Sequence, residues 1–152
     1  MRQAHRSENP ARLTTSGELL CPSAQPNMPE SRVFGVICGS PGKPHMLALR
    51  APIASNEELV QLALPARPTE VFRFAAICQQ ERCCHFDGTS CRLAARIVQS
   101  LTTVSDNLPY CPIRTACRWF SQEGGSACRR CPQIVTEVPD PLIKIKIVSD
   151  RG

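Results

Sequence analysis

Between positions 69 and 78 the chain reads Thr69-Glu70-Val71-Phe72-Arg73-Phe74-Ala75-Ala76-Ile77-Cys78. This stretch is rich in β-branched and aromatic side chains, which predicts a buried β-strand. The composition changes where the strand ends, because eight of the 10 cysteines fall between Cys78 and Cys131. The stretch therefore joins a β-sheet on its amino-terminal side to a cysteine-rich half on its carboxyl-terminal side.

Further strands are predicted on either side of this stretch. Arg32–Cys38 and Met46–Leu49 are short apolar runs separated by Gly- and Pro-rich turn residues, which is typical of a strand pair. Leu142–Val148 alternates apolar and polar residues, as a half-buried edge strand does. Ser55-Asn56-Glu57-Glu58 is a capping box and predicts a short helix that ends before Pro65.

The sequence divides into a tail and one domain. Residues 1–31 contain four prolines among polar residues without apolar periodicity, which predicts a disordered amino-terminal tail. Residues 32–152 are predicted to form a single domain, in which residues 78–131 are a cysteine-rich metal-binding region. Met28 directly precedes the first ordered segment, so one hypothesis is that translation begins there.

The start of the chain bears on the state of the thiols. The basic residues 1–6 are followed by charged residues rather than by an apolar core, so no secretion signal is expected. No run of about 18 apolar residues occurs, so no spanning helix and no membrane partner are predicted. We expect a cytoplasmic protein, where reducing conditions keep thiols free. A chain of 152 residues can bury a core without disulfides, so its clustered cysteines point to metal ligation.

Four cysteines of the second half have the spacing C-x5-C-x10-C-x2-C; they are Cys111, Cys117, Cys128 and Cys131. Pro112 suits the start of a helix and Gly124-Gly125 its end, so the chain is expected to double back and bring the four sulfurs together. A zinc ribbon normally shows two C-x2-C knuckles, whereas this segment has one. Irregular spacing is more typical of iron–sulfur clusters.

Other features of these four cysteines also favour a cluster, of the 4Fe–4S type, with zinc as the alternative cofactor. A proline follows both Cys111 and Cys131, a step that recurs after cluster ligands in ferredoxins. Segment 111–131 carries four arginines against one acidic residue, a local balance of +3 that offsets the charge of a four-thiolate cluster. Trp119 and Phe120 are expected to shield the cluster from water.

The candidate ligands of a second metal site are Cys78, Cys84, Cys91 and His85. Cys83 is the alternative to His85 as the fourth ligand. Ser90 is placed to cap a following helix, so Cys91 in its first turn is expected to favour the thiolate. Cys21, Cys38 and one of the adjacent pair 83 and 84 are expected to be plain buried side chains.

Catalytic motifs are weak, so the chain is not expected to be an enzyme by itself. The glycine-containing segment 39–44 lacks the first glycine and the Ser or Thr of a phosphate loop. His85 directly follows Cys84, and adjacent side chains rarely face each other as a nucleophile and its base. Cys128 and Cys131 form a C-x2-C pair that keeps a thiol oxidoreductase as an alternative, although no aromatic residue precedes Cys128.

The sequence thus predicts an α+β fold, with a small sheet of amino-terminal strands plus a carboxyl-terminal edge strand and a cysteine-rich, metal-stapled helical and loop half. Its expected function is to bind an iron–sulfur cluster for electron transfer, redox sensing or an accessory role, serving a protein partner that is a redox enzyme or a regulator. The main alternative is a zinc-stabilised interaction module that contacts nucleic acid. A net charge of +5 permits that partner, but aromatic residues are sparse and no basic run exceeds Arg129-Arg130.

Overall fold

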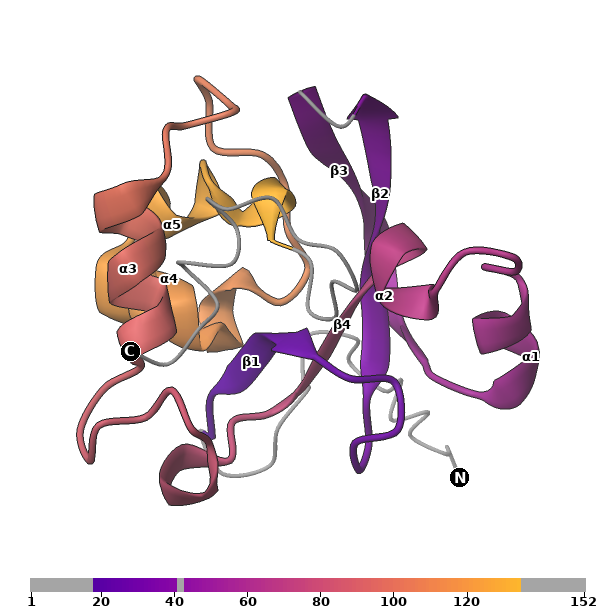
Figure 1. Ribbon diagram of the computed structural model, residues 1–152, viewed down its shortest axis with the longest axis horizontal. Coiled ribbons are helices and arrows are strands. Elements are labelled where there is room, and N and C mark those ends of the chain that lie inside the picture. Colours follow the sequence, from indigo (N-terminus) through magenta and orange to yellow (C-terminus); the bar gives the residue numbers. More distant parts are fainter. Residues whose placement is uncertain (1–17, 41–42, 135–152) are drawn as a thin grey trace, which may run out of the picture.

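A computed structural model of the chain describes residues 18–40 and 43–134. It contains a four-stranded antiparallel sheet in the order β1-β4-β2-β3, together with several short helices (Figure 1). The strands are β1 Leu20–Ala24, β2 Arg32–Ser40, β3 Lys43–Ala54 and β4 Phe72–Ile77. The predicted small α+β fold is confirmed, as are the β2–β3 strand pair and the strand at β4. The metal-stapled part of the expectation stays a prediction.

β4 occupies an inner position of the sheet, paired with β1 on one side and with β2 on the other. Five of its six residues are buried, which explains why this stretch is apolar nearly throughout instead of alternating. Arg73 is the one charged residue of the strand, and it too is buried, with 1% of its surface exposed. Its guanidinium donates to the carbonyl oxygens of Cys131 at 2.7 Å and Pro22 at 2.8 Å, and so joins the sheet to the cysteine-rich half.

Alternate residues of the sheet supply two buried clusters. Phe34 and Ala75 pack in the cluster that contains Trp119. Their chain neighbours Val33 and Phe74 pack in a separate cluster on the opposite face. Successive side chains of a strand point to opposite faces, so both faces of this sheet carry a core.

β1 corrects the predicted boundary of the domain. Residues 1–31 were expected to be a disordered tail, but Leu20–Ala24 forms a strand in which Cys21 pairs with Ala76. The tail prediction is therefore wrong for this strand, because an inner β4 needs a partner along its second edge. Residues 1–17 and the predicted edge strand 142–148 lie outside the described residues.

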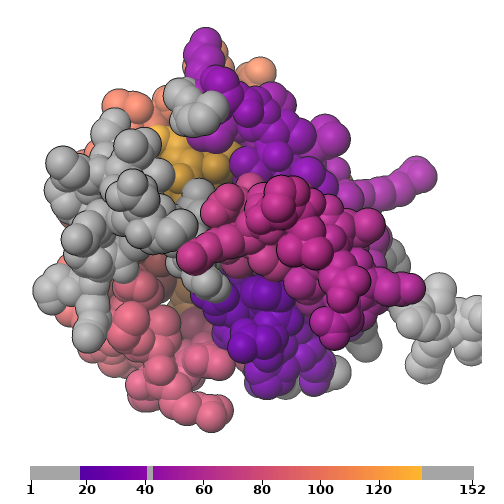
Figure 2. Space-filling view, turned by 45° about the vertical axis from the view of Figure 1, so that its right-hand side comes forward, coloured from indigo at the N-terminus to yellow at the C-terminus, as the bar shows by residue number. Residues whose placement is uncertain are grey.

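Two short helices stand on the side of the sheet that Figure 2 turns toward the viewer. α1 spans Glu57–Gln61, which confirms the predicted short helix, but its N-cap is Asn56, whose side chain accepts from the Leu59 backbone amide at 2.8 Å. The predicted capping box does not form, because the Ser55 hydroxyl donates to the Pro26 carbonyl instead. α2 spans Pro68–Val71 and takes the first residues of the stretch predicted as a strand. Proline is favoured in a first helical turn, so the strand begins only at Phe72.

The cysteine-rich half packs on the other face of the sheet (Figure 1). Its elements are η1 Gln80–Arg82, α3 Arg92–Ser100, η2 Arg114–Ala116, α4 Arg118–Glu123, α5 Gly125–Cys128 and η3 Cys131–Gln133. α3 buries Leu93 and Ile97, and Leu101 is buried just beyond its end, so these residues attach the helix to the core. Within the described ranges, none of these helices has the length and apolar character needed to cross a bilayer.

Two local predictions in this half are wrong. Ser90 does not cap α3; the N-cap is Cys91, and Ser90 donates its backbone amide to Asp87 at 2.8 Å instead. The helix expected from Pro112 starts later, because a 3₁₀ turn precedes α4. The predicted stop is confirmed at Gly124, whose φ of +68° suits glycine, although α5 begins directly after it.

Candidate functional site

The four cysteines predicted as the main site surround one cavity of about 80 Å³, to which Cys111, Cys117, Cys128 and Cys131 all contribute. Each comes from a different turn of the cysteine-rich half. Cys111 precedes η2, Cys117 joins η2 to α4, Cys128 ends α5, and Cys131 begins η3. We call these four the C-terminal quartet. The structure gathers them as the spacing predicted, and their role as ligands stays a prediction.

Apolar side chains complete the wall of this cavity. Phe34, Ile113 and Trp119 line it from the core, so the sulfurs lie against a surface that excludes water. His45 and Met46 of β3 also line it, although His45 itself is exposed. The sequence did not point to either residue, because β3 reaches the quartet only through its pairing with β2.

Burial governs the acid–base state of the quartet's free thiols. Desolvation raises the pKa of Cys111 to about 11, and it raises the pKa of Cys117 still further. The pKa of Cys128 is also raised, chiefly by burial, although a hydrogen bond from Arg114 opposes the shift. A thiol oxidoreductase requires a lowered thiol pKa, so the shift at Cys128 counts against that alternative. A bound cation would be needed to hold these groups as thiolates.

Backbone amides are nevertheless directed at the sulfurs. Hydrogen bonds from the amides of Trp119 and Phe120 oppose the pKa rise of Cys117, and the amide of Ile113 does the same for Cys111. This arrangement follows from the local structure, because a residue that precedes a helical turn faces the unpaired amides of that turn. Such donors are the means by which proteins stabilise cluster thiolates.

The four arginines of the segment do not all serve the quartet. Arg114 lines the cavity and stacks its guanidinium 5.8 Å from the centre of the Phe120 ring. Arg118 points elsewhere, over the ring of Phe86. Arg130 donates to backbone carbonyls at 2.7 and 2.8 Å and is used to hold α5 in place. At the quartet itself, the charges of Arg114 and Arg129 both act on the Cys128 thiol, so only part of the expected surplus is directed at the sulfurs.

A second set of cysteines lines a separate cavity of about 370 Å³, and it comprises Cys21, Cys78, Cys83, Cys84 and Cys91. The thiols that act electrostatically on Cys21 are those of Cys91, Cys78 and Cys83. Burial raises the pKa of Cys21 to about 12. We call Cys21, Cys78, Cys83 and Cys91 the N-terminal quartet.

This membership differs from the predicted second site. Cys21 was expected to be a spare hydrophobe, but β1 carries it to the same cavity as the other three. Cys84 and His85 line the cavity too, with the Cys84 side chain exposed to solvent. The thiolate expected at Cys91 is not favoured, since burial raises its pKa against the opposing amides of Leu93 and Ala94.

Neither quartet is drawn together as the ligands of one bound ion are. Among residues 18–40 and 43–134, no three His, Cys, Asp or Glu side chains are placed to hold a single metal ion. Within each quartet the sulfurs surround a cavity and do not converge on a point.

Comparison of the chain with protein-family models, curated proteins and solved structures finds no match.

Proposed function

We propose that the protein binds an iron–sulfur cluster, of the 4Fe–4S type, through Cys111, Cys117, Cys128 and Cys131. The observation that supports it is the convergence of four thiols from four separate turns on one water-poor cavity. Iron–sulfur clusters are held by four cysteine thiolates, and they accept ligands from irregularly spaced turns. Other uses of a buried thiol, such as core packing, do not require four of them around one space.

The shape of the site favours a cluster over zinc. A zinc ion lies about 2.3 Å from each of its four sulfurs, which forces those sulfurs close together. A cluster places its own iron and sulfide atoms between the ligands, so its four thiolates stand farther apart. Side chains that border a common cavity from four irregularly spaced turns suit the second arrangement.

The surroundings suit an anionic group. The guanidinium of Arg114 and the amides directed at Cys111 and Cys117 offset negative charge on the sulfurs. Positive charge and hydrogen bonds to cluster sulfurs raise the reduction potential. The cluster, when bound, supplies one-electron chemistry, and we propose that the protein serves a redox enzyme or regulator as its electron carrier, redox sensor or accessory subunit.

Anaerobic purification of the full chain tests this function. We expect a brown protein with a broad visible absorption and matched iron and sulfide, of which Cys117→Ser loses about four of each per chain. Cys38→Ser is the matched control, because Cys38 is a half-buried thiol of β2 that lines neither cavity. It should keep the full content.

Three results would overturn the proposal. A colourless protein with stoichiometric zinc would make the zinc-stabilised interaction module the leading function. A folded protein without metal would remove both metal functions. Equal metal content in Cys117→Ser and Cys38→Ser would show that the C-terminal quartet does not bind the metal.

A further inference from the structure

We propose that Cys21, Cys78, Cys83 and Cys91 form a second four-thiolate site, which takes an iron–sulfur cluster of its own. This inference goes beyond the proposed function, because the two quartets share no cysteine and line different cavities. It shares with that function only the class of cofactor, so each can fail without the other.

The fold brings the four thiols together from four elements. The register of β1 on β4 sets Cys21 opposite Ala76, and the amide of Cys78 donates to the Leu19 carbonyl at 2.8 Å, so both cysteines lie at one end of this strand pair. Cys83 follows η1, and Cys91 is the N-cap of α3. All four border the cavity of about 370 Å³.

The loop between Cys83 and Cys91 is held in a closed shape. A β-bridge joins Phe86 to Cys91, and the Arg92 amide donates to the His85 carbonyl at 2.7 Å. The side chain of Gln122 on α4 also fixes the backbone of Cys91. It accepts a hydrogen bond from the Cys91 amide and donates one to the Cys91 carbonyl, both at 2.8 Å. The thiol positions are therefore set by the fold before any ligand binds.

The cavity offers the partners that an anionic cluster needs. The Ser23 amide donates to Cys21 Sγ and the His85 amide to Cys83 Sγ, each at 3.4 Å. Arg82 and Arg118 also line the cavity, while no Asp or Glu does so among the residues described. Amide donors and cations at the sulfurs lower the cost of the cluster's charge.

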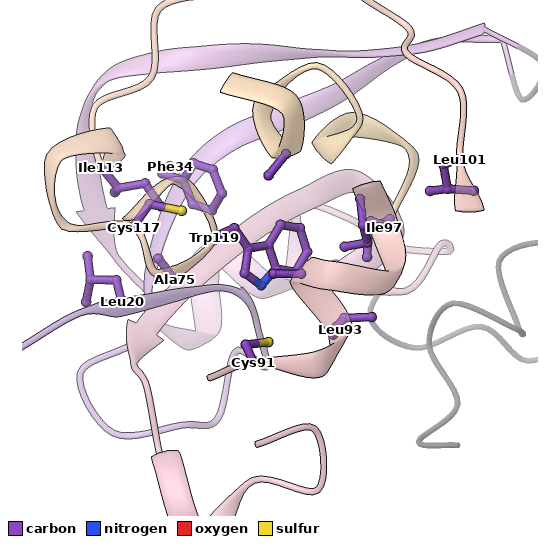
Figure 3. Packing of buried hydrophobic residues seen from close by; sticks show 13 residues of the cluster. Leu20, Phe34, Ala75, Cys91, Leu93, Ile97, Leu101, Ile113, Cys117 and Trp119 are labelled. Atoms are coloured by element: carbon purple, nitrogen blue, oxygen red, sulfur yellow. The ribbon is translucent and has the colours of Figure 1, made fainter. Parts of the chain in front are cut away.

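Trp119 connects the two sites. Its buried indole lines both cavities, and Figure 3 shows it between Cys117 of one quartet and Cys91 of the other. Two clusters bound as proposed would be separated by this one side chain. Unpaired electrons on clusters that both lie against one side chain should interact magnetically, which provides a readout independent of metal content.

Iron and sulfide analysis of the anaerobic full chain and three variants tests the second site. We expect about eight irons in the wild type and about four in Cys21→Ser and in Cys83→Ser. Cys83 lies in a surface turn, so its variant keeps the test valid if a change in β1 prevents folding. Cys38→Ser is the matched control, since its thiol lines neither cavity, and it should retain about eight.

The reduced wild type should show an electron paramagnetic resonance spectrum broadened by two interacting clusters, and Cys83→Ser should lose that broadening. Full iron in Cys83→Ser, an equal loss in Cys38→Ser, or zinc in place of iron at this site would overturn the inference. Iron lost from Cys83→Ser but retained by Cys117→Ser would instead overturn the proposed function and leave the second site standing.

Discussion

The two quartets reach similar arrangements by different routes. The C-terminal quartet lies within residues 111–131 and is assembled by short helices and turns that follow one another along the chain. The N-terminal quartet extends from Cys21 to Cys91 and needs β1, β4 and α3 to be in place before its thiols meet. A set of ligands that is local in sequence can be recognised from spacing, whereas a set drawn from a sheet edge cannot.

The largest effect on stability and on cofactor content is expected at Trp119, the side chain that lines both cavities. Trp119→Ala removes an indole that is 2% exposed and borders both cavities, so it should cost about 3–5 kcal/mol of unfolding free energy. Both sites should lose cofactor together. Denaturant titration and iron analysis measure the two effects, with the exposed Leu62→Ala as control. Loss of iron from one quartet only would show that Trp119 does not link cofactor retention at the two sites.

Arg73 tests the attachment of both quartets to the sheet. Its guanidinium bonds the carbonyls of Cys131 and Pro22, which are a member of one quartet and a neighbour of Cys21 in the other. Arg73→Ala breaks two charge-assisted hydrogen bonds in a buried place and should cost about 3 kcal/mol. Chemical denaturation measures it against Arg50→Ala, an exposed arginine of β3. A cost equal to that of the control would contradict the role assigned to Arg73.

A variant at Gln122 should affect the N-terminal quartet and leave the C-terminal quartet unchanged. Its side chain holds Cys91 through two hydrogen bonds and does not line the C-terminal quartet's cavity. Gln122→Ala should cost about 1–2 kcal/mol and speed the loss of the N-terminal cofactor to a chelator. Gln133→Ala is the matched control, because it removes one glutamine bond, to the Thr102 carbonyl, away from Cys91. Equal chelation rates in the two variants would contradict the prediction.

The smallest effect is expected at the Asp87 turn, which shapes only the N-terminal quartet's loop. Hydrogen bonds from the amides of Ser90 and Thr89 lower the pKa of Asp87 to about 2. Since the native state holds the carboxylate, its stabilisation is present above pH 4 and is lost as the pH falls toward 2. Asp87→Asn should flatten that part of the pH–stability curve, measured by thermal unfolding. An unchanged slope would contradict the assignment.

Several parts of the fold are readable from local patterns. The strands at β2 and β4, the short helix at α1 and the stop at Gly124 each depend on residues a few positions apart. The parts that were wrong depend on distant partners. Ser90 was expected to cap α3, but the Asp87 side chain accepts its amide, and the helix expected after Pro112 is interrupted so that Cys117 faces the core.

The candidate site divides in the same way. Spacing was enough to name the C-terminal quartet, since a C-x2-C pair and two turns keep its members near one another in any compact arrangement. Cys21 had no such signal, because it lies in a polar, proline-rich stretch 57 residues before Cys78. Only its pairing with β4 brings it to the second cavity.

By itself the sequence determined the strand periodicity, the helix ends and the concentration of thiols after Cys78, since these depend on neighbours along the chain. The tertiary structure alone decided that Cys21 joins the other thiols at the second cavity, and that Trp119 borders both cavities. The physical reason is that strand pairing and side-chain burial depend on contacts between residues far apart in the chain, and the spacing of neighbouring residues does not specify those contacts.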